Sequence, residues 1–261
     1  MSVVINGTNL KSTTFNGQSV DSIYYNGSLV WERPPEIQLI SGIQSDGTAW
    51  IKTDFGTEDF TYTSGSSTKV DGYAEYQFTP LKEFPISNRK YTVFHNNSSN
   101  INTRFFGKLN TDNYSTQNPM ALRMGFGYAS SGVIGVPVYV GYRYKIEFSC
   151  KSGSYGYLYY YVYDSKGNVI RHNSFSSDNT ADAASPTSDK ITLFGGGDEE
   201  IRQSVVFHSF TFGGNKSIEN ERQRILQPAI MKRKGVETVG LYDVKRDIFY
   251  GPQEGSFIPH Y

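Results

Sequence analysis

Cysteine is almost absent from this chain: its 261 residues include one, Cys150. A single cysteine cannot form an internal disulfide, which excludes a small fold held together by disulfides. A catalytic thiol would need a histidine partner and electropositive surroundings, and the sequence indicates neither. Because Cys150 ends the strand-like run Tyr144–Cys150, we expect it to be a small buried hydrophobic residue.

An excess of one charge and long apolar runs are also absent. The 25 Lys and Arg residues balance the 25 Asp and Glu residues, and the densest basic segment is Lys232-Arg233-Lys234. Three cations in a predicted solvated turn are too few to follow a phosphate backbone, so nucleic acid is not an expected partner. No stretch approaches the roughly 20 apolar residues of a membrane-spanning helix. The segment Met1–Gly7 lacks the features of a signal peptide. We therefore expect that the chain is made in a cytoplasm and does not insert into a membrane.

Runs of the helix-forming residues Ala, Leu, Glu and Lys are missing, whereas 20 Tyr and 17 Phe residues are present. Tyr, Phe, Val and Thr fit a pleated, half-buried surface, so the composition predicts an all-β protein. One segment, Ser217–Gln227, has a thin apolar stripe and stops at Pro228. We favour a non-helical interpretation of it.

Asn-Gly occurs three times in the first thirty residues at ten-residue spacing, at Asn6-Gly7, Asn16-Gly17 and Asn26-Gly27. This dipeptide is the strongest short-range signal for a two-residue type I′ hairpin turn. The spacing predicts a small four-stranded β-meander over residues 1–32. Since so small a unit cannot bury enough surface to be stable alone, it must dock either on another chain or on the main domain.

A short linker and one larger domain follow. Residues 33–36 contain Pro34-Pro35, which cannot donate to a strand ladder and hold the chain extended. From residue 37 to 261, short strand-like segments recur between turn residues without alternating helices, which predicts two packed antiparallel sheets. A polar tract, Ser174–Asp189, is predicted to be a loop. The expected strands are Ile37–Ile40, Ala49–Thr53, Gly72–Thr79, Tyr91–His95, Thr103–Lys108, Ala121–Gly127, Val138–Val140, Tyr142–Cys150, Tyr157–Asp164, Val169–His172, Ile191–Phe194, Ser204–Phe212 and Gly240–Tyr242.

Side-chain alternation assigns faces to three of these strands. In Tyr142–Cys150 the aromatic and aliphatic residues alternate with charged ones, and in Ser204–Phe212 Val206 and His208 lie opposite Phe207, Ser209 and Thr211. The tyrosine-rich run has Leu158, Tyr160 and Val162 on one face and, on the other, Tyr157, Tyr159, Tyr161 and Tyr163. A tyrosine ladder can stack on sugar rings and bond to sugar oxygens. We favour instead an inner sheet face with cross-strand aromatic contacts.

Two stretches carry a resemblance to a known fold family. Ile37–Phe55 is similar to the opening of concanavalin-A-like, laminin-G-like jelly-roll domains of phage structural proteins and gut bacterial surface proteins. The segment Gly47–Asp54 stands where that family has GTQYIDTG. Ser204–Phe212 resembles the penultimate core strand, and Pro228–Asp243, ending in Gly-Leu-Tyr-Asp, resembles the closing segment. The resemblance brackets Ile37–Ile258, and its middle portion is not recognisable.

The resemblance implies a lectin-like jelly-roll β-sandwich over residues 37–261. The preceding module, which closes with Tyr25–Glu32, resembles leader modules of phage virion proteins. Together they imply a virion structural protein of the fibre, tail or head-decoration type. It would attach to other virion proteins through residues 1–32, form a homo-oligomer and adhere to host-surface glycans. The alternatives are a glycan-binding module of a bacterial surface protein and, least favoured, a glycan-active enzyme.

The sequence offers no catalytic or metal-binding constellation. Retaining glycosidases need two carboxyl groups about 5–5.5 Å apart, which alternating acids on one strand supply, and no strand here has that pattern. The histidines His95, His172, His208 and His260 are scattered. Asp243 and Asp247 alone are too few for calcium. The glycines Gly195–Gly197 lack the Lys-Ser/Thr pair of a phosphate loop. We expect no enzyme, no metal and no cofactor, and the ligand-binding residues stay unassigned.

Overall fold

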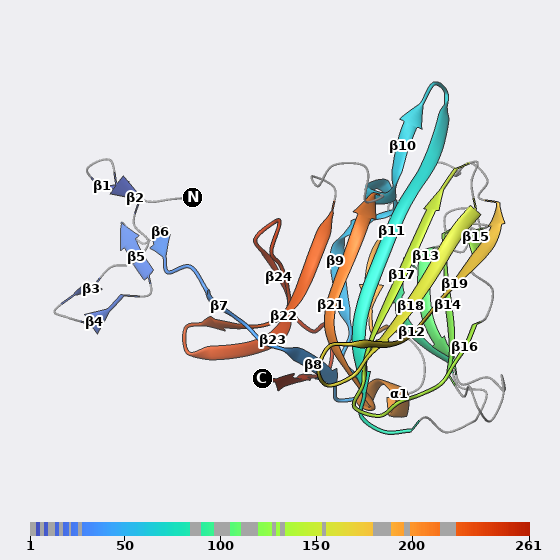
Figure 1. Cartoon of the computed structure of the whole chain (residues 1–261). Coiled ribbons are helices and arrows are strands. Elements are labelled where there is room, and N and C mark those ends of the chain that lie inside the picture. The colour runs from blue at the N-terminus through green and yellow to red at the C-terminus, as the bar shows by residue number, and fades with distance from the viewer. Residues whose placement is uncertain are drawn as a thin grey trace.

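The computed structural model is nearly all β-structure (Figure 1). Among the residues it describes, the helices are α1 (Glu199–Gln203) and the 3-10 turn η1 (Thr57–Phe60). Neither is long and apolar enough to cross a membrane. The described residues are 4–5, 8–9, 14–15, 18–20, 22–25, 28–83, 90–96, 105–110, 120–126, 129–130, 134–152, 155–179, 189–195, 199–214 and 223–261.

The larger sheet is antiparallel and has β11 near its middle. Its main strands are, in spatial order, β19 (Val169–Asn179), β18 (Tyr155–Tyr163), β17 (Arg143–Lys151), β11 (Ser67–Pro80), β21 (Val205–Gly214), β22 (Arg224–Arg233), β23 (Val236–Asp243) and β24 (Ile248–Tyr250). Four further strands lie off the main order: β10 (Thr61–Ser64) pairs with β11, β7 (Glu36–Leu39) with β22, and β8 (Gly42–Ser45) with both β21 and β25 (Phe257–His260).

The second sheet packs against the first, and Figure 1 shows several of its strands behind β11, β17 and β18. A short strand, β16 (Ile134–Val136), pairs with β14 at its margin. Its other strands, in spatial order, are β15 (Ala129–Ser130), β14 (Met120–Phe126), β13 (Phe105–Asn110), β12 (Lys90–His95), β20 (Lys190–Leu193) and β9 (Ile51–Gly56). The prediction of an all-β sandwich is confirmed, while its concanavalin-A-like jelly-roll type stays a prediction.

Aromatic side chains fill the space between the two sheets. Phe212 on β21 packs on Phe94 of β12 with ring centroids 5.0 Å apart, and Tyr76 on β11 lies 6.1 Å from the same Phe94. The ring centroids of Phe60 and Phe105 lie 4.5 Å apart. Each fully buried ring of this kind contributes about 1.5–3 kcal/mol to folding. Cys150 is buried in the same core, as expected, and burial raises the pKa of its thiol to about 12.

The expected alternation in Ser204–Phe212 is wrong after Phe207. Gln77 pairs with Ser209 whereas the next residue, Phe78, pairs with Phe207, so a β-bulge places one extra residue, His208, on β21. Phe207 and Phe210 are both buried, and Ser209 and Thr211 are not. The bulge shifts the inward positions of the strand by one residue, which no local sequence pattern marks.

Other segments also differ from expectation. Arg224–Gln227 belongs to β22, in keeping with the non-helical interpretation, and residues 217–222 lie outside the described residues. Pro228 lies inside the strand, between the part that pairs with β21 and the part that pairs with β7. A proline is tolerated where a strand changes its neighbour, because a regular ladder there does not need its missing N–H. Residues 174–179 extend β19. Val138–Val140 lies between strands.

The N-terminal segment forms three separate hairpins instead of one four-stranded meander. Their pairs are β1 (Val4–Ile5) with β2 (Thr8–Asn9), β3 (Thr14–Phe15) with β4 (Gln18–Ser19), and β5 (Ser22–Tyr25) with β6 (Ser28–Glu32). Each hairpin brackets one Asn-Gly pair, and those turn residues lie outside the described residues. Each segment between turns contains two short strands instead of the expected one, and no ladder among the described residues joins the hairpins.

The hairpins lie to one side of the sandwich in Figure 1 and continue into β7. The Glu32 carboxylate there pairs with Arg233 at 2.6 Å and with Lys234 at 2.8 Å, on the turn between β22 and β23. Hydrogen bonds from these two cations lower the pKa of Glu32. The basic turn, expected to be merely solvated, therefore contacts the end of β6. The domain boundary at residues 33–36 stays a prediction.

Two strand glycines give a stability test of the core. A Cβ on Gly107 would lie 2.2 Å from Phe94 Cε1, whereas on Gly72 its nearest neighbour would be Cys150 Sγ at 3.4 Å. We expect Gly107→Ala to cost about 1–3 kcal/mol, because the buried Phe94 ring must move. Gly72→Ala should melt near the wild-type temperature. Equal melting temperatures of the two variants, measured by calorimetry, would contradict this packing.

Candidate functional site

The outer face of the larger sheet is formed by strands β11, β17 and β18. Alternate residues of each strand enter the core, represented by Tyr76, Ile146 and Tyr160, all buried. The intervening residues therefore point away from the core. These outward residues, called the outer face below, are Tyr73, Glu75, Gln77 and Thr79 of β11, Arg143, Lys145, Glu147 and Ser149 of β17, and Tyr157, Tyr159, Tyr161 and Tyr163 of β18.

Strand register arranges the outer face in rows. Tyr159 lies opposite Glu147, which lies opposite Glu75 on β11. In the next row, Tyr161 lies opposite Lys145, which lies opposite Gln77. Directly opposed residues in an antiparallel pair have Cβ atoms about 4.5–5.5 Å apart, so each row is a set of contacting side chains.

The four tyrosines of β18 form a ladder on this face, with Tyr157 41% exposed and the others partly exposed. Tyr157 stacks on Tyr159, and Tyr161 on Tyr163, with ring centroids 6.4 Å apart in both pairs. We favoured an inner position for these rings, and that prediction is wrong, because Leu158, Tyr160 and Val162 are the buried side. Both faces of the strand are hydrophobic enough to be buried, so sequence alone could not rank them.

Polar side chains beside the ladder hold one another in place. Glu75 accepts hydrogen bonds from the Tyr73 hydroxyl at 2.7 Å and from Gln77 Nε2 at 3.0 Å. Lys145 Nζ donates to Glu147 Oε1 at 2.6 Å and lies 4.8 Å from the centre of the Tyr161 ring. Burial and the charge of Glu75 raise the pKa of the Tyr73 hydroxyl, which stays protonated and remains a donor. These contacts among the side chains of the outer face exist without a bound ligand.

A pocket of about 490 Å³ lies at the end of the ladder that Tyr163 occupies. It is lined by residues of four strands (β11, β17, β18 and β21) and of the turn after β18, among them Gln77, Thr79, Arg143, Tyr163, Asp164 and His208. Its volume is within the range of about 300–1,000 Å³ that is typical of small-ligand sites. The ladder and the pocket together form one continuous candidate site.

In the structure two carboxylates lie side by side that the sequence analysis did not predict to be neighbours. Glu75 and Glu147 are cross-strand partners, although 72 positions separate them in the sequence (147 − 75 = 72). Both oxygens of Glu75 accept hydrogen bonds, and Glu147 is ion-paired with Lys145. Both carboxylates therefore act as hydrogen-bond acceptors in the structure.

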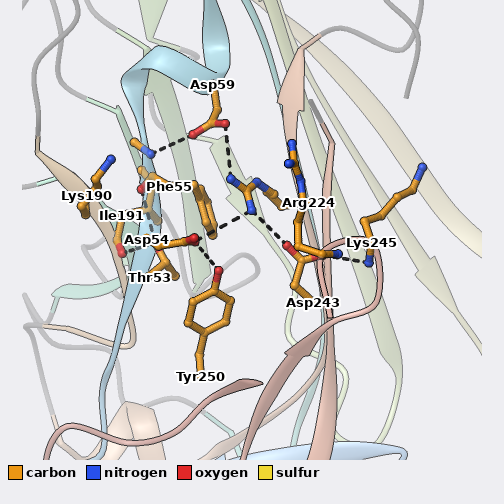
Figure 2. Close-up of polar contacts among 12 residues, drawn as sticks. Thr53, Asp54, Phe55, Asp59, Lys190, Ile191, Arg224, Asp243, Lys245 and Tyr250 are labelled. Carbon is orange, nitrogen blue, oxygen red and sulfur yellow. Dashed lines mark hydrogen bonds and ion pairs between the residues drawn. The ribbon is translucent and has the colours of Figure 1, made fainter. Parts of the chain in front are cut away.

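A second polar cluster, shown in Figure 2, joins the two sheets at one margin. The guanidinium of Arg224 lies 3.4 Å from Asp243, 3.6 Å from Asp59 and 3.8 Å from Asp54. Its charge also lies 5.4 Å from the centre of the Phe55 ring. Burial alone would lower the pKa of Arg224, but Asp59 and Asp54 raise it, so the cation is permanent. Because its acids already surround a cation, we interpret this cluster as structural.

The described residues contain no group of three metal ligands. Asp243 accepts hydrogen bonds from the amides of Lys245 and Arg246, and Asp247 accepts one from Tyr242. His208 contacts the Ser41 carbonyl oxygen and the Thr79 hydroxyl, and His260 contacts Gln44. His172 stacks on Tyr161 and borders the ladder.

No protein-family model matches the chain, and no curated protein matches it. The enzymatically active domain of bacteriophage CBA120 tailspike protein 2 is 14% identical, with a TM-score of 0.37 over 69% of this chain and 29% of that one. The carbohydrate-binding module CBM66 from Bacillus subtilis is 10% identical, with a TM-score of 0.30 over 67% and 97%. Scytalido-glutamic peptidase is 8% identical, with a TM-score of 0.30 over 84% and 97%. The neighbours thus include phage tailspike and carbohydrate-binding domains, at similarities that assign no function.

If the Arg224 cluster joins the two sheets, removal of its cation should lower the stability of the fold. Arg224→Met leaves the buried Asp243 and its neighbours without a cation, which should cost about 3–5 kcal/mol. Arg233→Met removes an arginine whose side chain is 55% exposed and should cost less than about 1 kcal/mol. Urea unfolding of both variants measures the difference. If the two midpoints fall by the same amount, the cluster does not join the sheets.

Proposed function

We propose that this chain is a non-enzymatic phage virion structural protein that adheres to host-surface glycans through its outer face. The single observation that supports this most is the partly exposed tyrosine ladder of β18. Aromatic rings carry a large apolar surface and a polar hydroxyl on one rigid side chain, which suits a sugar with its apolar C–H face and its hydroxyls.

The length of the ladder suits an extended glycan. Alternate residues of a strand lie about 6.6 Å apart, so four tyrosines present ring surfaces over about 20 Å. Donors and acceptors flank the rings on one side through Lys145 and Ser149, and on the other side through Ser174 and Ser176 of β19. Because the sheet fixes these groups, little conformational entropy is lost on binding.

The role in a virion rests on the sequence resemblance and on the N-terminal hairpins. The three hairpins are short, and a two-stranded hairpin is marginally stable by itself. Their connection to the sandwich through Glu32 is an ion pair on the surface, which contributes little. Residues 1–32 are therefore suited to binding other virion proteins or other copies of the chain, which would stabilise them.

A glycan hydrolase is the second candidate, and the opposed Glu75 and Glu147 favour it. Donors engage both carboxylates in the structure, which favours binding over proton transfer. Incubation of the wild-type chain with a glycan that it binds should release no new reducing ends. Release that Glu147→Gln abolishes would establish the hydrolase instead.

The ladder is tested by substitution. Tyr159→Ala and Tyr161→Ala should each weaken glycan binding by about two- to tenfold, since the contact of one aromatic ring with the face of a sugar is worth roughly 0.5–1.5 kcal/mol. Both should melt near the wild-type temperature because the rings lie outside the core. Tyr62→Ala, on the distant β10 hairpin, is the control. Binding on an array of bacterial glycans measures the effect, and unchanged binding by both ladder variants would refute the proposed face.

Removal of residues 1–32 tests the attachment role. The sandwich should keep its melting temperature, while oligomer mass or incorporation into virions should be lost. Glu32→Gln, which keeps the hairpins and removes the ion pairs with Arg233 and Lys234, should assemble normally. Light scattering and sedimentation measure both variants. Normal assembly of the truncated chain would mean that the hairpins only pack on their own sandwich.

A further inference from the structure

The pocket beside Tyr163 contains an arginine with no acceptor. Arg143 Nη and Nε atoms make no hydrogen bond or ion pair with any part of the chain that the structure describes. By contrast, the guanidinium groups of Arg33, Arg171, Arg202, Arg224 and Arg233 each make a hydrogen bond or ion pair, and that of Arg123 lies over the Phe106 ring.

Arg143 is also the cation of this pocket. The pKa of His208, which lines the pocket too, is lowered by burial and by the charge of Arg143 against the opposing hydrogen bond to Ser41, which favours the neutral imidazole. Its Nδ1 lies 2.7 Å from the Ser41 carbonyl oxygen, which can only accept, so Nδ1 carries the proton. Nε2 then accepts the hydrogen bond of the Thr79 hydroxyl at 2.8 Å. The remaining lone pairs of Thr79 can accept a bond from a ligand.

The acid that lines the pocket does not neutralise Arg143. Asp164 Oδ1 accepts bonds from the amides of Lys166 and Asn168, both at 2.9 Å, and Oδ2 accepts one from Asn168 Nδ2 at 3.1 Å. These bonds turn the carboxylate into the β18–β19 turn. Consistently, partial burial lowers the pKa of Arg143, and Tyr163 is the group that opposes this.

We propose that the pocket binds an acidic sugar residue of the glycan, whose carboxylate pairs with Arg143. The planar guanidinium fork matches a carboxylate with two parallel hydrogen bonds. Tyr163 lies opposite Arg143 in the strand register, so the ring of the same sugar can contact the end of the ladder. Thr79 and Gln77 complete the pocket with groups that suit sugar hydroxyls. This inference rests on the proposed glycan-binding function and adds the ligand class.

The test uses the full chain and three acidic polysaccharides: hyaluronan, alginate and polygalacturonate. Each is offered in its native form and after chemical reduction of its carboxylates to alcohols, which keeps the backbone and removes the charge. We expect at least one native polymer to bind tenfold or more tightly than its reduced form. Arg143→Gln should lower the affinity for the native polymer to that for the reduced one.

Two further variants separate the carboxylate contact from charge in general. Arg143→Lys keeps the charge without the fork and should give an intermediate affinity. Lys52→Gln removes an exposed cation of β9, on the second sheet, and should bind like the wild type. A fall in affinity in Lys52→Gln equal to that in Arg143→Gln would overturn the inference, because any lost positive charge would then suffice.

The remaining outcomes distinguish this inference from the proposed function. If native and reduced polymers bind the wild type equally, or if neutral glycans bind and acidic ones do not, the acidic-sugar inference fails. In both cases binding that depends on Tyr159 and Tyr161 leaves the proposed function intact. If no glycan of either kind binds, the proposed function itself fails.

Discussion

The structure depends on the alternation of inward and outward side chains along one long strand, β11, which is hydrogen-bonded along both edges. Within its 14 residues, Asp71–Phe78 pair with β17 on one side and Gly72–Pro80 pair with β21 on the other. Tyr76 and Phe78 enter the aromatic core, while Glu75 and Gln77 face outward. A register slip by one residue would exchange these faces and bury the carboxylate. The same constraint therefore fixes the core and positions the polar half of the candidate site.

The core and the site are two sides of a single sheet. On β18 the buried Leu158 and Val162 hold the strand, and the intervening Tyr159 and Tyr161 are held outward as a consequence. Because the buried side chains fix the strand, the outer rings have few conformations open to them, and they lose little conformational entropy when a ligand binds. The neighbouring Arg143 is positioned in the same way, since Tyr144 beside it is buried and bonds to the carbonyl oxygen of Pro137 at 2.7 Å.

The alternation of side chains along the sequence predicted the strands well, but it did not predict which strands pair with one another. The alternation of β17 and β18 and the buried Cys150 could be inferred because they depend on residues adjacent in sequence. The pairing of Glu75 with Glu147 and the Arg224 cluster depend on register between distant segments, which a single sequence does not record. The bulge at His208 and the exposed side of β18 were missed for a different reason: both faces of each strand carry hydrophobic residues.

The function proposed for this chain requires a glycan to bind the outer face of β17 and β18. A crystal structure of the full chain with a bound oligosaccharide, chosen from those retained on the glycan array, tests it most directly. A sugar ring should stack on at least one of Tyr157, Tyr159, Tyr161 and Tyr163. A sugar held on the second sheet or by the N-terminal hairpins, with the tyrosine ladder open to solvent, would contradict it.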